Sequence, residues 1–219
     1  MTKPMKSSNK MRLGFYHHIP IRSEGGDLYI ISHMGRFLDG LASQCDQLIV
    51  FTHAADDKDA QADYRLNKAN ISWVDMGPRM SAPYFTFFGH KYRRILEKHL
   101  NEMDTMLIRG PTPLLPALAR INKKLPTALL LGGDYLAGMA SSNQPFWRKP
   151  LFWFCSLNYN PPQLQVAKPC LPLENSHRLY TQMKPHLSEL VETRTTTLSS
   201  DDFFRREDTC QQNPVRLLY

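Results

Sequence analysis

The chain alternates short, continuous apolar runs with segments of helical periodicity, and this alternation restricts the fold more than any other feature. Uninterrupted apolar runs are typical of parallel strands that are buried on both faces. Between them apolar residues recur at intervals of three and four, which favours helices. We therefore predict an α/β fold, a Rossmann-like parallel sheet with helices on both faces. The predicted strands cover residues 12–16, 47–52, 71–76, 105–109 and 126–134, and the predicted helices begin at Asp27 and cover 85–101, 111–124 and 176–192.

In open parallel sheets ligands bind beyond the carboxyl ends of the strands. We therefore expect the loops at 17–26, 109–113 and 132–135 to open on one edge. The first loop contains Gly25 and Gly26 but no G-x-G-x-x-G dinucleotide fingerprint. The glycines either let the chain turn or bring an anion close to the N–H groups of a helix N-terminus. The second interpretation requires a helix that starts at Asp27, with this residue as N-cap or first-turn acid.

The candidate substrate-binding residues lie in these loops, and their side chains suit a sugar or phosphate ligand. They are His17, His18, Glu24, Gly25, Gly26, Asp27, Arg109 and Asp134. Structural roles are open to them as well. The two histidines can form a solvated pair, Arg109 can pair with Asp134 or cap a helix, and Asp134 can be an N-cap. No third ligand follows the histidines at a metal-binding spacing, so we predict no metal site.

Composition limits the kinds of partner. The net charge of +7 and the pI near 9.3 favour anionic partners, without choosing among nucleotides, phosphorylated substrates and acidic membranes. Nucleic acid is not expected, because no known binding module occurs and the basic residues do not form one run. Four scattered cysteines, a polar N-terminus and the lack of a bilayer-length apolar run predict a cytoplasmic protein.

Two segments place basic residues beside aromatic or aliphatic ones, as at the interface of an anionic membrane. For residues 90–100 a helix with one face in the core and one in solvent is the simpler explanation. For residues 146–154 we expect peripheral contact with the inner face of the membrane, through Trp147, Arg148 and Lys149. Part of that segment could instead pack against another domain.

The predicted organisation has four parts. Residues 1–10 form a flexible tail, 11–200 the α/β domain, 201–214 an interdomain linker and 215–219 a strand. The last segment, VRLLY, is apolar and reaches the end of the sequence. It predicts the first strand of a C-terminal domain that is missing.

Two stretches resemble the GT-B glycosyltransferases of family 4. GFYHHIPIRSEGGDLYIISHMGRFLDGLA, followed by QLIVFT, resembles their N-terminal domain, and TTTLSSDDFFRREDTCQQNPVRLLY resembles the passage into their C-terminal domain. The resemblance implies retaining sugar transfer from a nucleotide-sugar donor, without a metal or other cofactor. It also implies that this half shapes the site for a glycan or lipid-linked acceptor. Gly25 and Gly26, beside Glu24 and Asp27, would lie near the donor phosphates and the transferred sugar.

The chain also departs from that family. Many members have a histidine at the end of the fifth strand, where Gly133 and Asp134 stand here, so no catalytic residue is assigned. In that family the C-terminal half carries a Glu-x7-Glu motif and holds the nucleotide, and we expect this half to be missing from the chain. Because that half would stabilise the leaving diphosphate, we expect no useful turnover from this chain alone. Two alternatives remain open: a non-catalytic α/β module that binds a glycan, lipid or protein partner, and a complete small nucleotide-binding domain.

Overall fold

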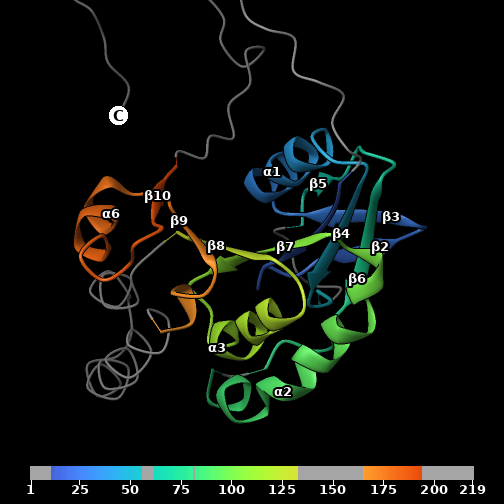
Figure 1. The fold of residues 1–219 in the computed structure, drawn as a ribbon. Coiled ribbons are helices and arrows are strands. Elements are labelled where there is room, and N and C mark those ends of the chain that lie inside the picture. The colour runs from blue at the N-terminus through green and yellow to red at the C-terminus, as the bar shows by residue number, and fades with distance from the viewer. Residues whose placement is uncertain (1–10, 56–61, 81, 133–164, 194–219) are drawn as a thin grey trace, which may run out of the picture.

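A seven-stranded parallel sheet forms the centre of the protein (Figure 1). The computed structural model describes residues 11–55, 62–80, 82–132 and 165–193. The strand order is β10-β9-β8-β7-β1-β4-β6. The strands are β1 (Arg12–Tyr16), β4 (Gln47–Thr52), β6 (Ile71–Asp75), β7 (Thr105–Gly110), β8 (Thr127–Leu131), β9 (Leu171–Glu174) and β10 (Val191–Glu192). The predicted α/β class is thus confirmed, and the first five strands of this sheet lie within a few residues of their predicted bounds.

Alternate side chains of the central strands enter two different cores. Leu13 and Phe15 of β1 belong to one buried cluster, whereas Tyr16 belongs to the other. The same division separates Val50 from Phe51 on β4. On a strand that is buried on both faces, successive side chains all enter a core, so apolar and polar residues do not alternate. This explains the continuous apolar runs in the sequence.

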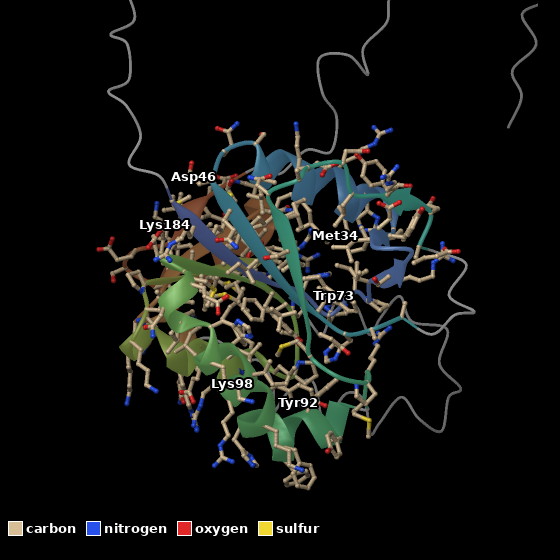
Figure 2. All side chains as sticks on the ribbon, turned by 90° about the vertical axis from the view of Figure 1, so that its right-hand side faces the viewer. Met34, Asp46, Trp73, Tyr92, Lys98 and Lys184 are labelled. Carbon is tan, nitrogen blue, oxygen red and sulfur yellow. The ribbon has the colours of Figure 1, made fainter. Side chains whose placement is uncertain are left out.

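Helices cover both faces (Figure 1). α1 (Ser32–Ala42) packs Met34 and Leu38 on one face. The other face carries α2 (Ala82–Lys98), α3 (Leu115–Leu118) and the 3₁₀ turns η1 (Leu100–Glu102) and η2 (Ala119–Lys123). Figure 2 shows Met34 and Tyr92 on opposite sides of the sheet. Among the described residues, no helix is both long and apolar enough to cross a bilayer.

The order of the strands defines a switch point between β1 and β7. From β1 the chain adds β4 and β6 on one side, and then returns to add β7, β8, β9 and β10 on the other. The loops after β1 and β7 therefore leave from adjacent strand ends in opposite directions. Open parallel sheets bind ligands in a crevice at such a switch point, and we call the space beyond these two strand ends the crevice. All strands of this sheet run parallel, so these two loops share one edge, as predicted. The third loop starts beside them at Gly132 and continues outside the described residues.

The predicted helix start at Asp27 is wrong. Residues 22–30 form a hairpin of β2 (Arg22–Glu24) and β3 (Asp27–Ile30), and β5 (Tyr64–Arg65) extends it to a separate three-stranded sheet. Gly25 and Gly26 are its two-residue turn, with φ of 59° and 88°. Positive φ at both turn residues is what a type I′ hairpin requires, and glycine meets it without steric cost. Asp27 is therefore not an N-cap, and its carboxylate binds Arg65 at 2.8 Å.

The true N-terminus of α1 already holds a carboxylate. Asp63 accepts hydrogen bonds from the backbone N–H of Ser32 at 2.9 Å and from the Ser32 hydroxyl at 2.8 Å. These bonds lower the pKa of Asp63. The favourable position for an anion at this helix is thus filled from within the chain.

The second half departs further from the sequence-based expectations. The segment predicted as a helix over 176–192 contains only α6 (His177–Met183) and then β10, and β9 lies in a proline-rich region where no strand was predicted. The predicted helix over 111–124 is split into α3 and η2. The tail 1–10, Asp134 with the helix that it was expected to cap, the linker 201–214 and the strand 215–219 lie outside the described residues.

We predict that alanine has opposite effects at two exposed glycines. A Cβ would meet nothing within 4 Å at Gly26 or at Gly40 in α1, so only the backbone conformation differs. Gly26→Ala should lower the free energy of unfolding by about 1–2 kcal/mol, because φ is positive there. Gly40→Ala should raise it by about 0.5–1 kcal/mol through helix propensity. Urea denaturation measures both, and an unchanged stability of Gly26→Ala would contradict the hairpin turn.

Candidate functional site

Basic side chains gather at the carboxyl edge of the sheet, around the switch point. His17 and His18 follow β1 directly, and their ring centroids lie 4.3 Å apart. Arg109 near the end of β7 acts electrostatically on both histidines. Arg79, in the loop after β6, acts on both as well. The structure therefore brings together three of the predicted site residues, His17, His18 and Arg109, and adds Arg79 to them.

His17 continues the α1-facing side of β1, two residues after Phe15, and its ring stacks on Phe15 at 6.4 Å. The side chain is buried, and the Ile19 backbone N–H donates a 3.3 Å hydrogen bond to Nδ1. Since Nδ1 accepts, the neutral ring carries its proton on Nε2. Burial, followed by the neighbours His18 and Arg109, lowers the pKa of His17 to about 2. At neutral pH His17 is therefore an uncharged donor.

Arg109 is half-buried on the same face as His17. Its guanidinium lies 3.7 Å from Met34 Sδ and 5.4 Å from the centre of the Phe37 ring. These contacts from α1 orient the group but do not balance its charge. No carboxylate within the described ranges forms an ion pair with Arg109. Burial lowers the pKa of Arg109, although a guanidinium stays protonated at neutral pH.

Gly132, at the end of β8, leaves space beside Arg109. A Cβ on this residue would lie 3.6 Å from the Gly110 carbonyl oxygen and 4.0 Å from Arg109 Nε. The expected ion pair between Arg109 and Asp134 is not tested, because Asp134 lies outside the described residues.

On the α2-facing side, three buried polar atoms have no hydrogen-bond partner among the described residues: Tyr16 Oη, His18 Nδ1 and His53 Nε2. His53 follows β4, and its Nδ1 donates to the Gly77 carbonyl at 3.0 Å. Burial lowers the pKa of His53, and it lowers that of His18 to about 4. Thr112 lies near the Tyr16 phenol but makes no hydrogen bond to it within ordinary geometric limits. This side of the crevice therefore combines largely buried polar groups with the exposed cation Arg79, which acts on Tyr16, His18 and His53.

The analysis of the sequence missed His53, Arg79 and Glu174. His53 directly follows an apolar strand in QLIVFTH, the same position that drew attention to His17. Glu174 ends β9, is fully buried, and accepts hydrogen bonds at Oε1 from the N–H groups of Asn175 and Ser176. Its Oε2 has no hydrogen-bond partner in the part of the chain that the structure describes, and burial raises the pKa of Glu174 to about 7. No strand was predicted here, so this carboxyl group could not be assigned to the edge.

The four hairpin candidates form a separate group. Gly25 and Gly26 are exposed at the turn. The Glu24 carboxylate lies 3.6 Å from the Arg22 guanidinium, and the Asp27 carboxylate forms an ion pair with Arg65. The requirement for positive φ already explains the two glycines, so their proposed contact with a ligand stays a prediction. The predicted membrane residues Trp147, Arg148 and Lys149 lie outside the described part of the chain.

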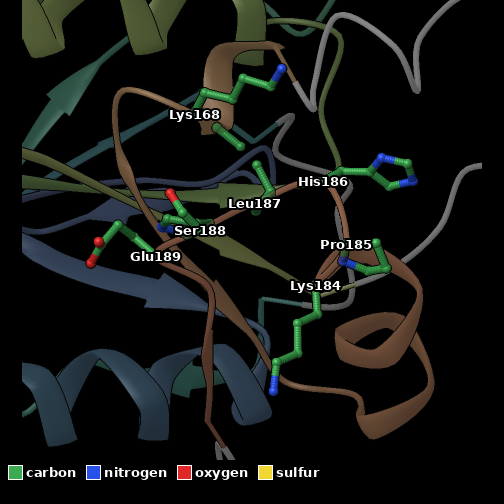
Figure 3. Close-up of a pocket in the computed structure, with 9 residues that line it drawn as sticks. Lys168, Lys184, Pro185, His186, Leu187, Ser188 and Glu189 are labelled. Atoms are coloured by element: carbon green, nitrogen blue, oxygen red, sulfur yellow. The ribbon is translucent and has the colours of Figure 1, made fainter.

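Two hollows lie at the opposite, amino-terminal edge. One, of about 420 Å³, is bordered by Lys168, Lys184 and His186, and Figure 3 shows these three side chains pointing in different directions. The other, of about 580 Å³, lies beside Arg12 and Asp104 where β1 and β7 begin. In the first hollow the charged side chains diverge, and in the second Arg12 and Asp104 neutralise each other in an ion pair of 2.8 Å. Ligands of open parallel sheets also bind at the other edge.

The crevice can therefore attract an anion and donate hydrogen bonds to it. Within the described ranges, no three His, Cys, Asp or Glu side chains are placed to hold a metal ion. Comparison of the chain with protein-family models and with curated proteins found no match. The chemistry of the crevice must therefore be argued from its own residues.

We predict opposite effects of two substitutions on acid stability. The pKa values of His17 and His18 are depressed, so below about pH 6.5 the unfolded chain binds protons that the folded chain does not. For each histidine the free energy of unfolding then falls by about 1.4 kcal/mol for every unit by which the pH is lowered. Glu174 acts in the opposite direction, because its raised pKa favours protonation of the folded state below about pH 7.

His18→Gln should therefore flatten the loss of stability between pH 6.5 and 5, whereas Glu174→Gln should steepen it. Urea denaturation at half-unit pH intervals measures both slopes. Parallel curves for the wild type and His18→Gln would show that His18 is not desolvated.

Proposed function

We propose that the crevice above β1 and β7 binds a phosphate-bearing sugar compound, and that the chain is the acceptor-side half of a retaining, nucleotide-sugar-dependent glycosyltransferase. The observation that carries the proposal is Arg109, a half-buried guanidinium whose charge no described carboxylate balances. The resemblance to GT-B enzymes of family 4 supplies the sugar transfer, and the Rossmann-like sheet is compatible with it.

An unbalanced, partly buried cation favours an anionic ligand. Removing a charge from water costs several kcal/mol unless a partner compensates it. The Met34 sulfur and the Phe37 ring hold the guanidinium in place without supplying negative charge. An entering phosphate would supply it, and a guanidinium matches phosphate with two parallel hydrogen bonds.

The other residues of the crevice, His17 and Arg79, add donors rather than competing acceptors. His17 presents an Nε2–H because its Nδ1 is already occupied by the Ile19 N–H. Arg79 is exposed and acts on both histidines of the crevice. A neutral donor and two cations suit the oxygens of a phosphate group and would repel a cationic ligand.

Transfer itself needs more than this anion site. Departure of a nucleoside diphosphate requires stabilisation of the charge that develops on it. Arg109 and His17 can supply part of that stabilisation, and the second half of a GT-B enzyme would supply most of it. We assign to Arg109 and His17 a role in binding and orientation, and we assign no catalytic residue.

We predict that Arg109→Gln weakens binding of inorganic phosphate and of glucose 1-phosphate about 10- to 100-fold, because one charge-assisted interaction is lost. Titration calorimetry on the full chain measures this. Arg65→Gln is the matched control, since Arg65 is exposed and already paired with Asp27.

Equal losses in the two variants would contradict an anion site at Arg109. Tighter binding of glucose 1-phosphate than of phosphate would support the sugar part of the proposal. Transfer activity with nucleotide sugars, measured with and without a separately supplied GT-B C-terminal domain, separates a transferase half from a non-catalytic binding module.

A further inference from the structure

The outer side of α2 combines an exposed aromatic side chain with a line of cations. Phe87 has 77% of its surface exposed, far more than the helix residues Phe85, Tyr92 and Leu96, which are buried in the core. On a helix of 3.6 residues per turn, position 87 lies opposite those three. An ordinary amphipathic helix would carry a polar residue there.

Three cations follow Phe87 along the same side of α2. Lys91, Arg94 and Lys98 succeed it at intervals of four, three and four residues, and all three are exposed. Within the described part of the chain, none of them forms an ion pair. The one acidic residue of the helix, Glu97, is occupied by Arg93 at 3.5 Å and by Lys124 at 3.1 Å.

A second aromatic residue widens this surface. Phe88 is 39% exposed, and the Lys91 ammonium lies 4.8 Å above its ring. Phe88 also contacts Tyr84, one turn earlier, at 4.6 Å between ring centroids. Aromatic rings are thus exposed near the beginning of the helix and cations toward its end, on one face.

From this arrangement we infer that the outer face of α2, formed by Phe87, Phe88, Lys91, Arg94 and Lys98, docks on an anionic lipid bilayer. Exposed aromatic rings enter the headgroup region, and cations that no described carboxylate pairs with bind anionic headgroups. The complementary charge is the reason for choosing a membrane over an apolar protein partner. The inference is independent of the sugar compound proposed for the crevice.

The test uses the full chain and vesicles of equal parts phosphatidylglycerol and phosphatidylcholine, compared with pure phosphatidylcholine, in a sedimentation assay. We expect binding to the anionic vesicles and little to the neutral ones. Each cation near an anionic surface contributes about fivefold to partitioning. The triple variant Lys91→Gln, Arg94→Gln, Lys98→Gln should therefore bind about 100-fold more weakly, and Phe87→Ser should also reduce binding.

A matched control removes the same charge elsewhere. Lys168, Arg178 and Lys184 are exposed residues around α6, and their change to glutamine should leave vesicle binding nearly unchanged. An equal loss in this control would show that net charge, rather than the α2 face, controls binding. Full binding by the α2 triple variant would place the contact elsewhere. If Phe87→Ser converts a lipid-free dimer to a monomer, measured by analytical ultracentrifugation, the face is an interface between two copies and the inference is overturned.

Discussion

The central position of β1, buried on both faces between β4 and β7, is the constraint on which the rest of the structure depends. Parallel pairing on both sides fixes the direction of every strand in the large sheet, so the residues that follow each strand meet at one edge. His17, His18 and His53 follow apolar strands directly, and they leave the core without a flexible connection. Their burial is therefore a consequence of the sheet, and so is the low pKa of each imidazole.

Burial has different effects on the charge of the histidines and on that of Arg109. The histidines lose their charge at neutral pH and act as neutral partners, whereas a guanidinium keeps its proton even when it is partly desolvated. Arg109 thus concentrates the positive charge of the buried part of the crevice in one oriented group. A low dielectric strengthens the attraction between this group and an anion, and the same low dielectric makes the unpaired cation costly. The proposed anion site is for this reason also a local source of instability, which a bound anion would relieve.

The sequence predicted what depends on local hydrophobicity and missed what depends on pairing. β1 and β4 were predicted with their observed bounds, because apolar runs of five or six residues suit strands buried on both faces. The segment after Gly26 was predicted as helix, since Leu28 and Ile31 also fit a helical period. Only pairing with residues 22–24 and 64–65 makes it a strand. Arg79 and Glu174 were missed because their place at the edge depends on spatial order. The prediction that His17, His18 and Arg109 share an edge needed only the parallel sheet, and it is confirmed.

The cations behind the net charge of +7 differ in their exposure to solvent, and they therefore differ in how strongly salt screens them. Arg109 is half-buried and held by Met34 and Phe37, whereas Lys91, Arg94 and Lys98 of α2 extend into solvent. Salt screens exposed charges beyond about 10 Å at 0.1 M ionic strength but screens buried groups much less. Binding of a small anion in the crevice should therefore depend only weakly on salt concentration, whereas binding of a lipid surface at α2 should depend on it strongly. Because the two proposed sites use different residues, a phosphate compound at Arg109 and an anionic surface at α2 would not compete for the same groups.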